Sequence, residues 1–215
     1  MGKIRKNPKD RHIFGRNQVQ VQVAGYRLQV AGFSEQLFAR TCSRIRQYLQ
    51  PATCNLQPAI FARMKILMVC LGNICRSPLA EGILIHKARE AGLSWTVESA
   101  GTNGYHNGEP PHRLSQKVAR INGIDISKQR SRPFSARDFH QFDLIFAMAS
   151  DVIDEMRSIA GRNYDPSKVD LLMNALHPGK NMDVPDPWYG GEEGYHEVFD
   201  MISIACEHII KKHTN

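Results

Sequence analysis

Long apolar runs are absent from this 215-residue sequence. No window approaches the roughly 18 consecutive apolar residues of a membrane-spanning helix, and no apolar stretch of signal-peptide length follows the basic N-terminus. With 42% hydrophobic and 23% charged residues, the composition is that of a soluble globular protein. We therefore expect a cytoplasmic protein with no Sec-type export and no membrane partner.

Paired cysteines and metal-binding patterns are also missing. The sequence has five cysteines at irregular spacing, and it contains no C-x-x-C pair and no Cys/His cluster with zinc spacing. It lacks a G-x-x-x-x-G-K-S/T motif, which excludes a nucleotide-binding P-loop. An odd number of cysteines favours a reducing compartment, with at least one thiol kept for chemistry, over a disulfide framework.

Acidic residues are scarce in the first 63 positions. Residues 1–63 carry 11 Lys and Arg against 2 Asp and Glu, whereas residues 64–215 carry 17 against 19. The net charge of +7 therefore comes entirely from the N-terminal segment. A basic segment of this kind can contact nucleic acid, but this one has no motif with base-reading geometry, so we do not expect a nucleic-acid partner.

Local structure is weakly patterned in the same segment. Residues 19–23 alternate like a strand and could pair with residues 26–30 as a hairpin, and residues 35–49 have a loose helical period. The segment is rich in Arg like a transit peptide, but it has only two serines. We expect residues 1–63 to be a poorly ordered extension, either disordered or translated from upstream of the true start. A folded accessory domain is the alternative.

Strands and helices alternate from Met64 onward. Short apolar runs predict strands, and periodic segments with capping residues predict helices. Ser77 and Pro78 have the types of an N-cap and a first helical residue, and Gly92 ends that helix. The predicted strands are residues 65–71, 95–99, 142–148 and 169–176, and the predicted helices are residues 77–91, 114–121, 150–159 and 194–211.

This order of elements predicts an α/β domain. Right-handed crossovers would build a doubly wound, four-stranded parallel sheet with helices on both faces, in three layers. Ligands in such folds bind at the carboxyl ends of the strands. Cys70 and Ser99 are predicted to lie at such ends.

The segment that joins the first strand to its helix has the residue types of an anion-binding loop. A helix N-terminus offers free N–H groups and a positive dipole end, and Gly72 would let the backbone curl around an anion. Arg76 can grip two phosphoryl oxygens, and the same positive field favours the thiolate form of Cys70. A Cys six residues before an Arg is weak evidence alone, and a structural Cys with a surface Arg is the alternative. The strand, glycine, Ser-Pro pair and helix around it favour the functional interpretation.

The nine residues CLGNICRSP resemble the phosphate-binding loop of low-molecular-weight protein-tyrosine phosphatases. The resemblance covers residues 64 to about 212, so residues 64–215 would be the phosphatase domain. It implies a flavodoxin-like fold, and hydrolysis of protein phosphotyrosine or small aryl phosphates through a phosphocysteine, without metal or cofactor. Cys70 would be the nucleophile and Arg76 the phosphate clamp, in a loop formed with Leu71, Gly72, Asn73, Ile74, Cys75 and Ser77.

The resemblance also implies roles for individual loop residues. Asn73 would shape the loop, and Ser77 would donate a hydrogen bond to the Cys70 sulfur. Cys75 matches a second loop cysteine of the family, which can pair with the nucleophile under oxidation. We therefore expect redox-regulated activity.

A proton donor is needed to expel a tyrosine oxyanion, and the loop has none. Downstream, Asp186 lies between Pro185 and Pro187 and is followed by Trp188. An Asp in such a turn is usually only a local hydrogen bonder, but the segment resembles the acid loop of the family. The resemblance makes Asp186 the general acid and base, with Asp183 as the second candidate.

A third resemblance covers residues 99–111. It implies that Ser99 braces the phosphate loop through Asn73, and that Tyr105, Trp188 and Tyr189 wall an aromatic slot. Ordinary packing is the alternative for each of these residues. One departure concerns the loop after the next helix, where many relatives carry a His of the same network and residues 127–132 have none.

Two related activities remain as alternatives. Thioredoxin-linked arsenate reductases need resolving cysteines after the loop, but no cysteine lies between Arg76 and Cys206. Protein-arginine phosphatases resemble this loop but usually carry Thr at the position of Ile74. An apolar side chain there suits an aryl phosphate better than a guanidinium group.

Overall fold

The computed structural model describes residues 18–23, 26–31 and 63–214. These residues belong to two units, 1–57 and 58–215. In the first unit, strand β1 (Gln18–Val23) pairs antiparallel with β2 (Tyr26–Ala31). The hairpin predicted from the alternating valines is confirmed. The helical period at residues 35–49, and the order of most of the N-terminal extension, lie outside the described residues.

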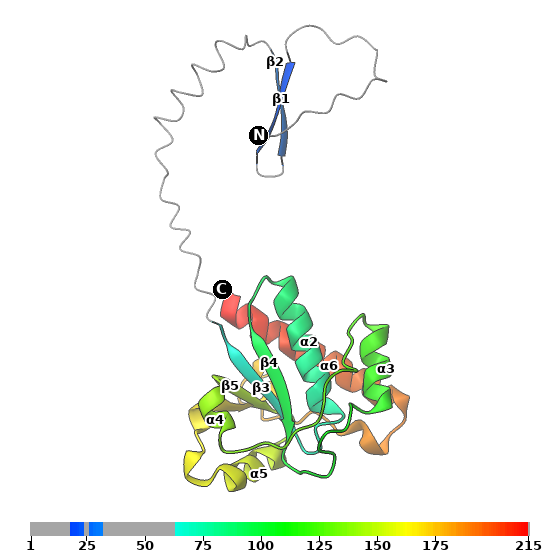
Figure 1. The fold of residues 1–215 in the computed structure, drawn as a ribbon, viewed down its shortest axis with the longest axis vertical. Helices are drawn as coiled ribbons and strands as arrows, with labels where there is room; N and C mark the ends of the chain where they lie inside the picture. Colours follow the sequence, from blue (N-terminus) through cyan, green and yellow to red (C-terminus); the bar gives the residue numbers. More distant parts are fainter. Residues whose placement is uncertain (1–17, 24–25, 32–62, 215) are drawn as a thin grey trace. The chain divides into compact units, whose positions relative to one another are not determined.

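A four-stranded parallel sheet forms the centre of the second unit (Figure 1). Its strands are β3 (Lys65–Cys70), β4 (Thr96–Gly101), β5 (Leu144–Ala147) and β6 (Val169–Leu171). They are ordered β4-β3-β5-β6, so the chain leaves β3 towards one edge and returns past it to β5. This is the start of the flavodoxin-like order, and it confirms the predicted sheet.

Helices cover both faces of the sheet. Helices α2 (Arg76–Glu90), α3 (Arg113–Ile121) and α6 (Glu192–Thr214) contribute to one hydrophobic cluster, and α4 (Asp138–Gln141) and α5 (Ser150–Ala160) contribute to the other. Short 3-10 helices complete the unit: η1 (Gly161–Asn163), η2 (Pro166–Lys168), η3 (Leu172–Ala175) and η4 (Pro187–Tyr189). The three predicted layers are therefore confirmed.

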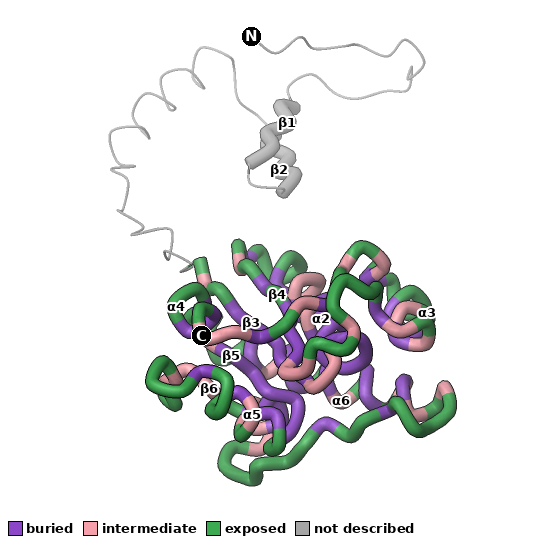
Figure 2. Tube along the Cα trace, turned by 60° about the horizontal axis from the view of Figure 1, so that its bottom comes forward, coloured by how far each residue is buried: buried purple, intermediate pink, exposed green. Residues whose placement is uncertain are grey.

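Strand β3 is buried on both faces, which explains why its apolar residues do not alternate with polar ones. Ile66 and Met68 belong to the cluster beneath α2 and α6, whereas Leu67 and Val69 belong to the cluster beneath α5. All four side chains are fully buried, and Figure 2 shows the strands as the buried centre of the domain. A strand that is covered on both faces needs apolar residues at every position, and its end is thereby held rigidly.

The predicted start of the first helix is wrong by two positions. Helix α2 begins at Arg76, and its N-cap is Cys75, which makes no side-chain capping bond. Ser77 lies inside the first turn, where its hydroxyl is 3.0 Å from the Cys70 sulfur. The Ser77 hydroxyl, which was predicted to cap the helix, therefore contacts the Cys70 sulfur instead.

The last predicted strand is too long. Strand β6 ends at Leu171, and residues 172–175 form η3, with Leu172 and Met173 buried. A short apolar run does not distinguish a buried strand from a buried turn of helix. Helix α4, a single turn of four residues, was missed because it is too short to show a period.

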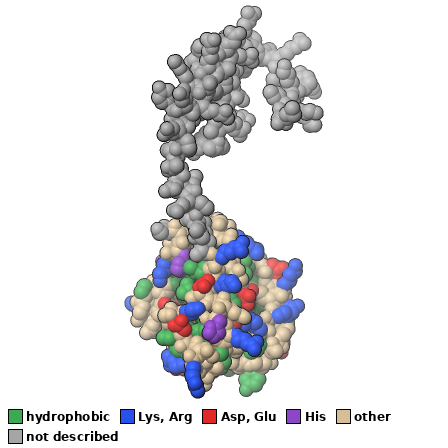
Figure 3. All heavy atoms as spheres, turned by 60° about the vertical axis from the view of Figure 1, so that its left-hand side comes forward, with side chains coloured by type: hydrophobic (Ala, Val, Ile, Leu, Met, Phe, Trp, Pro, Cys, Tyr) green, Lys and Arg blue, Asp and Glu red, His purple; other side chains and the backbone are tan. Residues whose placement is uncertain are grey.

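Charged side chains of both signs are interspersed on the surface of the second unit that Figure 3 presents. This agrees with the near balance of basic and acidic residues in positions 64–215. Among the described helices, none has the length and apolar character needed to cross a membrane.

Candidate active site

The loop between β3 and α2 lies where the strand order reverses. Strand β3 has β4 on one side and β5 on the other, so its carboxyl end opens at the topological switch point of the sheet. Cys70 is the last residue of β3, and Arg76 is the first residue of α2. No acidic residue lies in the first turn of α2, so the helix itself presents only its positive end to the loop.

Asn73, not Gly72, has the left-handed conformation that turns the loop. Its φ of 54° is rare for a residue with a side chain, and asparagine is among the few that tolerate it. The side chain holds this conformation: Nδ2 donates to Ser77 Oγ at 2.9 Å and to Ser99 Oγ at 2.8 Å. Oδ1 accepts from the backbone N–H of Arg132 at 3.0 Å. The predicted role of Gly72 in curling the backbone is therefore corrected.

Glycines matter here because of close approach. A Cβ on Gly101, at the end of β4, would lie 2.8 Å from the Leu71 carbonyl oxygen. A Cβ on Gly72 would lie 3.2 Å from Cδ2 of His106. The phosphate loop therefore rests directly on the backbone of β4, and His106 lies directly beside it.

Two hydrogen-bond donors converge on the Cys70 sulfur. The backbone N–H of Asn73 donates to it at 3.3 Å, and the Ser77 hydroxyl lies 3.0 Å away. Because Asn73 donates to Ser77 Oγ, the hydroxyl proton of Ser77 is free to point to the sulfur. These two contacts fix the position of the sulfur at the end of β3, as the predicted nucleophile requires.

Arg76 connects the loop to the acid segment. Its side chain is only 7% exposed, Nη2 donates to Asp186 Oδ2 at 2.7 Å, and Nη1 donates to the Val184 carbonyl at 3.1 Å. Its Nε is buried and has no partner among the described residues, and the two contacts use only one proton of each Nη, so donors remain for an oxyanion. The structure thus brings the predicted clamp and the predicted acid into contact.

Asp186 and Asp183 have different surroundings. Asp186 Oδ1 accepts from the backbone N–H of Trp188 at 3.1 Å, which caps η4 and turns the carboxylate towards the pocket. Asp183 instead accepts from the N–H and hydroxyl of Ser150, at 2.8 and 3.2 Å, at the start of α5. Asp186 lines the pocket and Asp183 does not.

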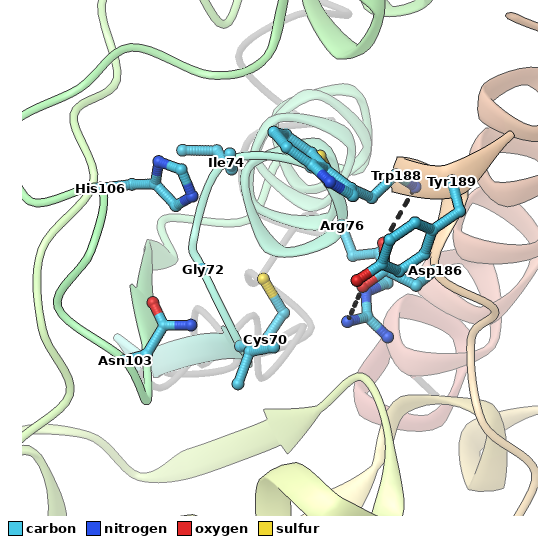
Figure 4. Close-up of a pocket in the computed structure, with 11 residues that line it drawn as sticks. Cys70, Gly72, Ile74, Arg76, Asn103, His106, Asp186, Trp188 and Tyr189 are labelled. Atoms are coloured by element: carbon cyan, nitrogen blue, oxygen red, sulfur yellow. Dashed lines mark hydrogen bonds and ion pairs between the residues drawn. The ribbon is translucent and has the colours of Figure 1, made fainter. Parts of the chain in front are cut away.

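These groups line one cavity of about 200 Å³. Figure 4 shows the Cys70 side chain pointing into it, with His106 and Asn103 on one side and Trp188, Tyr189 and Asp186 on the other. The remaining lining residues are Leu71, Gly72, Ile74, Cys75 and Arg76. Asn73, Ser77 and Ser99 support the loop from behind. Tyr105 is 86% exposed and does not line the cavity.

His106, which the sequence interpretation missed, lines the cavity, and His112 packs against Trp188 of the same wall. The Trp188 ring centroid is 6.0 Å from that of His106 and 5.4 Å from that of His112. Burial, with a smaller contribution from Arg113, lowers the pKa of His112, which favours a neutral ring beside the indole. His106 directly follows Tyr105 in the segment 99–111, and His112 comes directly after that segment, so closeness to it could have marked both histidines.

Cys75 lies in the same cavity but in a different environment from Cys70. Its sulfur is 3.6 Å from the hydroxyl of Tyr195, and burial raises the pKa of its thiol to about 11. Cys75 is therefore protonated at neutral pH. Neither cysteine is in a disulfide.

Glu81 lies at the outer end of the hydrogen-bond network formed by Asn73 and Ser99. Many relatives carry a histidine in this network, which residues 127–132 of this chain lack. The Ser99 hydroxyl donates to Glu81 Oε2 at 2.6 Å. Burial raises the pKa of Glu81 to about 7, against the lowering effect of this hydrogen bond. Its position one turn beyond Ser77 on α2 is the only signal that the sequence offered.

Comparison with known proteins agrees with this site. The family described as low molecular weight phosphotyrosine protein phosphatase matches residues 65–214. The Bacillus subtilis protein named low molecular weight protein-tyrosine-phosphatase YfkJ is 38% identical over 149 residues, which is 68% of this chain and 94% of that protein. The human low molecular weight phosphotyrosine protein phosphatase is 33% identical over 154 residues, 70% of this chain and 96% of that protein.

Solved structures show the same fold. The crystal structure of YfkJ aligns with a TM-score of 0.64 at 36% identity, over 70% of this chain and 94% of that one. The structure of DARP, a Drosophila arginine phosphatase, aligns with a TM-score of 0.65 at 32% identity, over 71% and 99%. The fold and the cysteine loop define a phosphatase. The chain belongs to the low molecular weight protein-tyrosine phosphatase family, and it is an enzyme of the protein-tyrosine phosphatase class.

Proposed function

We propose that the chain hydrolyses protein phosphotyrosine and small aryl phosphates through a phosphocysteine on Cys70. The observation that supports this most is the meeting of Cys70, Arg76 and Asp186 in one cavity. The Cys70 thiolate attacks phosphorus, the S–P bond forms, and the bond to the phenolic oxygen breaks as Asp186 protonates that oxygen. Water then attacks the phosphocysteine, Asp186 takes its proton, and the thiolate leaves with the Ser77 hydroxyl as donor.

Arg76 supports both steps through charge. Its planar guanidinium can bind two phosphoryl oxygens at once, where negative charge is redistributed in the transition state. A phosphoryl dianion beside Arg76 also places negative charge next to Asp186, 2.7 Å from the guanidinium. The Asp186 carboxyl is thereby placed beside the phosphoryl group and its leaving oxygen, where a general acid must lie.

The walls of the cavity favour an aryl phosphate. Ile74 presents an apolar side chain, and Trp188 and Tyr189 offer aromatic surface to a phenyl ring. Because an arginine phosphatase shares the fold, phosphoarginine is the nearest alternative substrate. Arsenate reduction is less well supported, since no cysteine follows Cys75 until the buried Cys206 in α6.

A panel of phosphopeptides tests the substrate class. For the full chain we expect kcat/KM for phosphotyrosine to exceed that for phosphoserine by about 100-fold or more, because only the aryl group reaches and fills the slot. Phosphoarginine should be hydrolysed more slowly than phosphotyrosine. Ile74→Thr is the matched variant, and it should move the preference towards phosphoarginine. Equal or faster hydrolysis of phosphoarginine by the wild type would overturn the assignment.

We also propose that Cys75 protects the nucleophile during oxidation. A peroxide oxidises the Cys70 thiolate to a sulfenic acid, and the Cys75 thiol then displaces water to form a disulfide. Replacement Cys75→Ser should convert reversible peroxide inactivation into loss that a thiol reductant does not restore. Cys206→Ser is the control, since Cys206 is buried in α6 and should leave recovery unchanged. Full recovery of the Cys75→Ser enzyme would exclude the protective role.

Residues 64–215 are the proposed phosphatase domain. The proposed location is a reducing compartment such as the cytoplasm. The family match begins at residue 65, and every residue of the site lies between positions 70 and 189. The nucleophile must remain a reduced thiol to act. A chain shortened to residues 64–215 that lost most of its kcat/KM would contradict this boundary.

A further inference from the structure

Behind the phosphate loop, hydrogen bonds connect Glu81 to the nucleophile. Glu81 accepts from Ser99 at 2.6 Å, Ser99 accepts from Asn73 at 2.8 Å, and Asn73 also donates to Ser77 at 2.9 Å. Ser77 in turn lies 3.0 Å from the Cys70 sulfur. The path therefore runs from the Glu81 carboxylate through Ser99, the Asn73 amide and Ser77 to the Cys70 sulfur.

The direction of the donors along this path is fixed. The Arg132 N–H donates to Asn73 Oδ1, so the amide cannot be reversed and its Nδ2 must be the donor. Ser99 Oγ receives one of the two Nδ2 protons and must direct its own proton elsewhere, which is to Glu81. Ser77 Oγ receives the other proton, and of its own two acceptors the Cys70 sulfur at 3.0 Å is nearer than the Ala100 carbonyl at 3.5 Å. The arrangement is complete only with an acceptor at Glu81.

We propose that Glu81 is a positioning residue for catalysis, whose carboxylate orients Ser99 and Asn73 and thereby the Ser77 hydroxyl at the Cys70 sulfur. The proposal rests on the assignment of Cys70 as the nucleophile. A charged acceptor binds the Ser99 proton more strongly than a neutral one does. Protonation of Glu81 therefore loosens the network without breaking the fold, and the loop is expected to respond to pH.

The surroundings of Glu81 place its protonation near neutral pH. Burial is the largest cause and raises its pKa to about 7. Glu98 of β4 raises the pKa further by repulsion, whereas Arg132 and hydrogen bonds from Ser99 and Gln129 lower it. Glu81 therefore changes from neutral to charged within the range in which the enzyme can be assayed.

The isosteric variant Glu81→Gln tests the proposal through a ratio of rates. For p-nitrophenyl phosphate, the ratio of wild-type to variant kcat/KM should be near one at about pH 5.5 and rise to about threefold to tenfold at about pH 8, with a midpoint near 7. Effects of pH that do not pass through Glu81 are common to both enzymes and cancel in the ratio. Glu98→Gln keeps Glu81 and removes only a repulsion that raises its pKa, so wild type and this variant should have equal kcat/KM at about pH 8, where Glu81 is charged in both.

A double-mutant cycle shows whether Glu81 acts through Ser99. In a Ser99→Ala background, Glu81→Gln should have no further effect on kcat/KM at about pH 8, because its route to the loop is gone. A ratio that does not change with pH, or additive effects in the cycle, would overturn the role of Glu81. A wild-type chain inactive on p-nitrophenyl phosphate would instead overturn the proposed function.

The melting temperature separates positioning from folding. Burial raises the pKa of Glu81 above its unfolded value of 4.5, so the folded state favours the neutral form and loses stability as pH rises towards 7. Glu81→Gln should therefore melt at the same or a higher temperature than wild type at about pH 8. Lower activity together with a lower melting temperature would assign Glu81 a structural role and contradict the proposal.

Discussion

Replacement of Cys70 by serine should lower kcat/KM for aryl phosphates by at least about 10⁴-fold. A serine hydroxyl is not ionised at neutral pH, so the attacking anion is lost while the shape of the side chain is kept. The loop itself should persist, because the Asn73 side chain holds it through Ser77, Ser99 and Arg132. Steady-state kinetics with p-nitrophenyl phosphate measures the loss.

The control for this variant is binding without chemistry. Inorganic phosphate should still bind the Cys70→Ser protein, because the helix N-terminus and Arg76 are unchanged, and titration calorimetry can measure its affinity. The Ser77→Ala variant retains Cys70 and should lose much less activity. Activity of Cys70→Ser within about tenfold of wild type would rule out Cys70 as the nucleophile.

Asp186→Ala should slow hydrolysis by about 10²- to 10⁴-fold for phenyl phosphate, and considerably less for p-nitrophenyl phosphate. A general acid helps only where charge develops on the leaving oxygen, and nitrophenolate needs little help. The variant also removes the charge that pairs with Arg76 at 2.7 Å. Phosphate affinity should therefore stay equal or improve while kcat falls.

Asp183→Ala is the matched control for the acid. Asp183 caps α5 through Ser150, so its loss should cost about 1 kcal/mol of stability. In Asp183→Ala, the ratio of the hydrolysis rates of phenyl phosphate and p-nitrophenyl phosphate should remain as in the wild type. Equal losses for both substrates in Asp186→Ala, or a change of that ratio in Asp183→Ala, would move the acid role away from Asp186.

The parts of the site that the sequence predicted are those set by local pattern. Cys70 and Arg76 could be assigned from the sequence because the apolar run, the loop and the start of the helix are contiguous in the chain. The resemblance added Asp186, which no local rule distinguishes from Asp183. Only tertiary contacts separate them, since Asp183 meets Ser150 and Asp186 meets Arg76.

The residues that were missed or misplaced depend on packing between distant segments. Glu81 is an ordinary helix residue until β4 brings Ser99 to it, and His106 reaches the cavity wall because Gly72 leaves space beside its ring. The curl of the loop was expected to depend on Gly72, because glycine leaves the backbone free to turn. Three hydrogen bonds instead hold Asn73 in the left-handed conformation, and a side-chain network of this kind is not visible in a sequence.

The contact between Arg76 and Asp186 has a consequence for synthesis on the ribosome. The two residues are 110 positions apart, and the Val184 carbonyl that also holds Arg76 is 108 positions away. At translation rates of about 5 to 20 residues per second, the growing chain carries the cysteine loop for roughly 5 to 20 s before the acid segment is made. During that interval the arginine lacks both partners. Phosphatase activity should therefore arise late, when the last third of the polypeptide has emerged and folded.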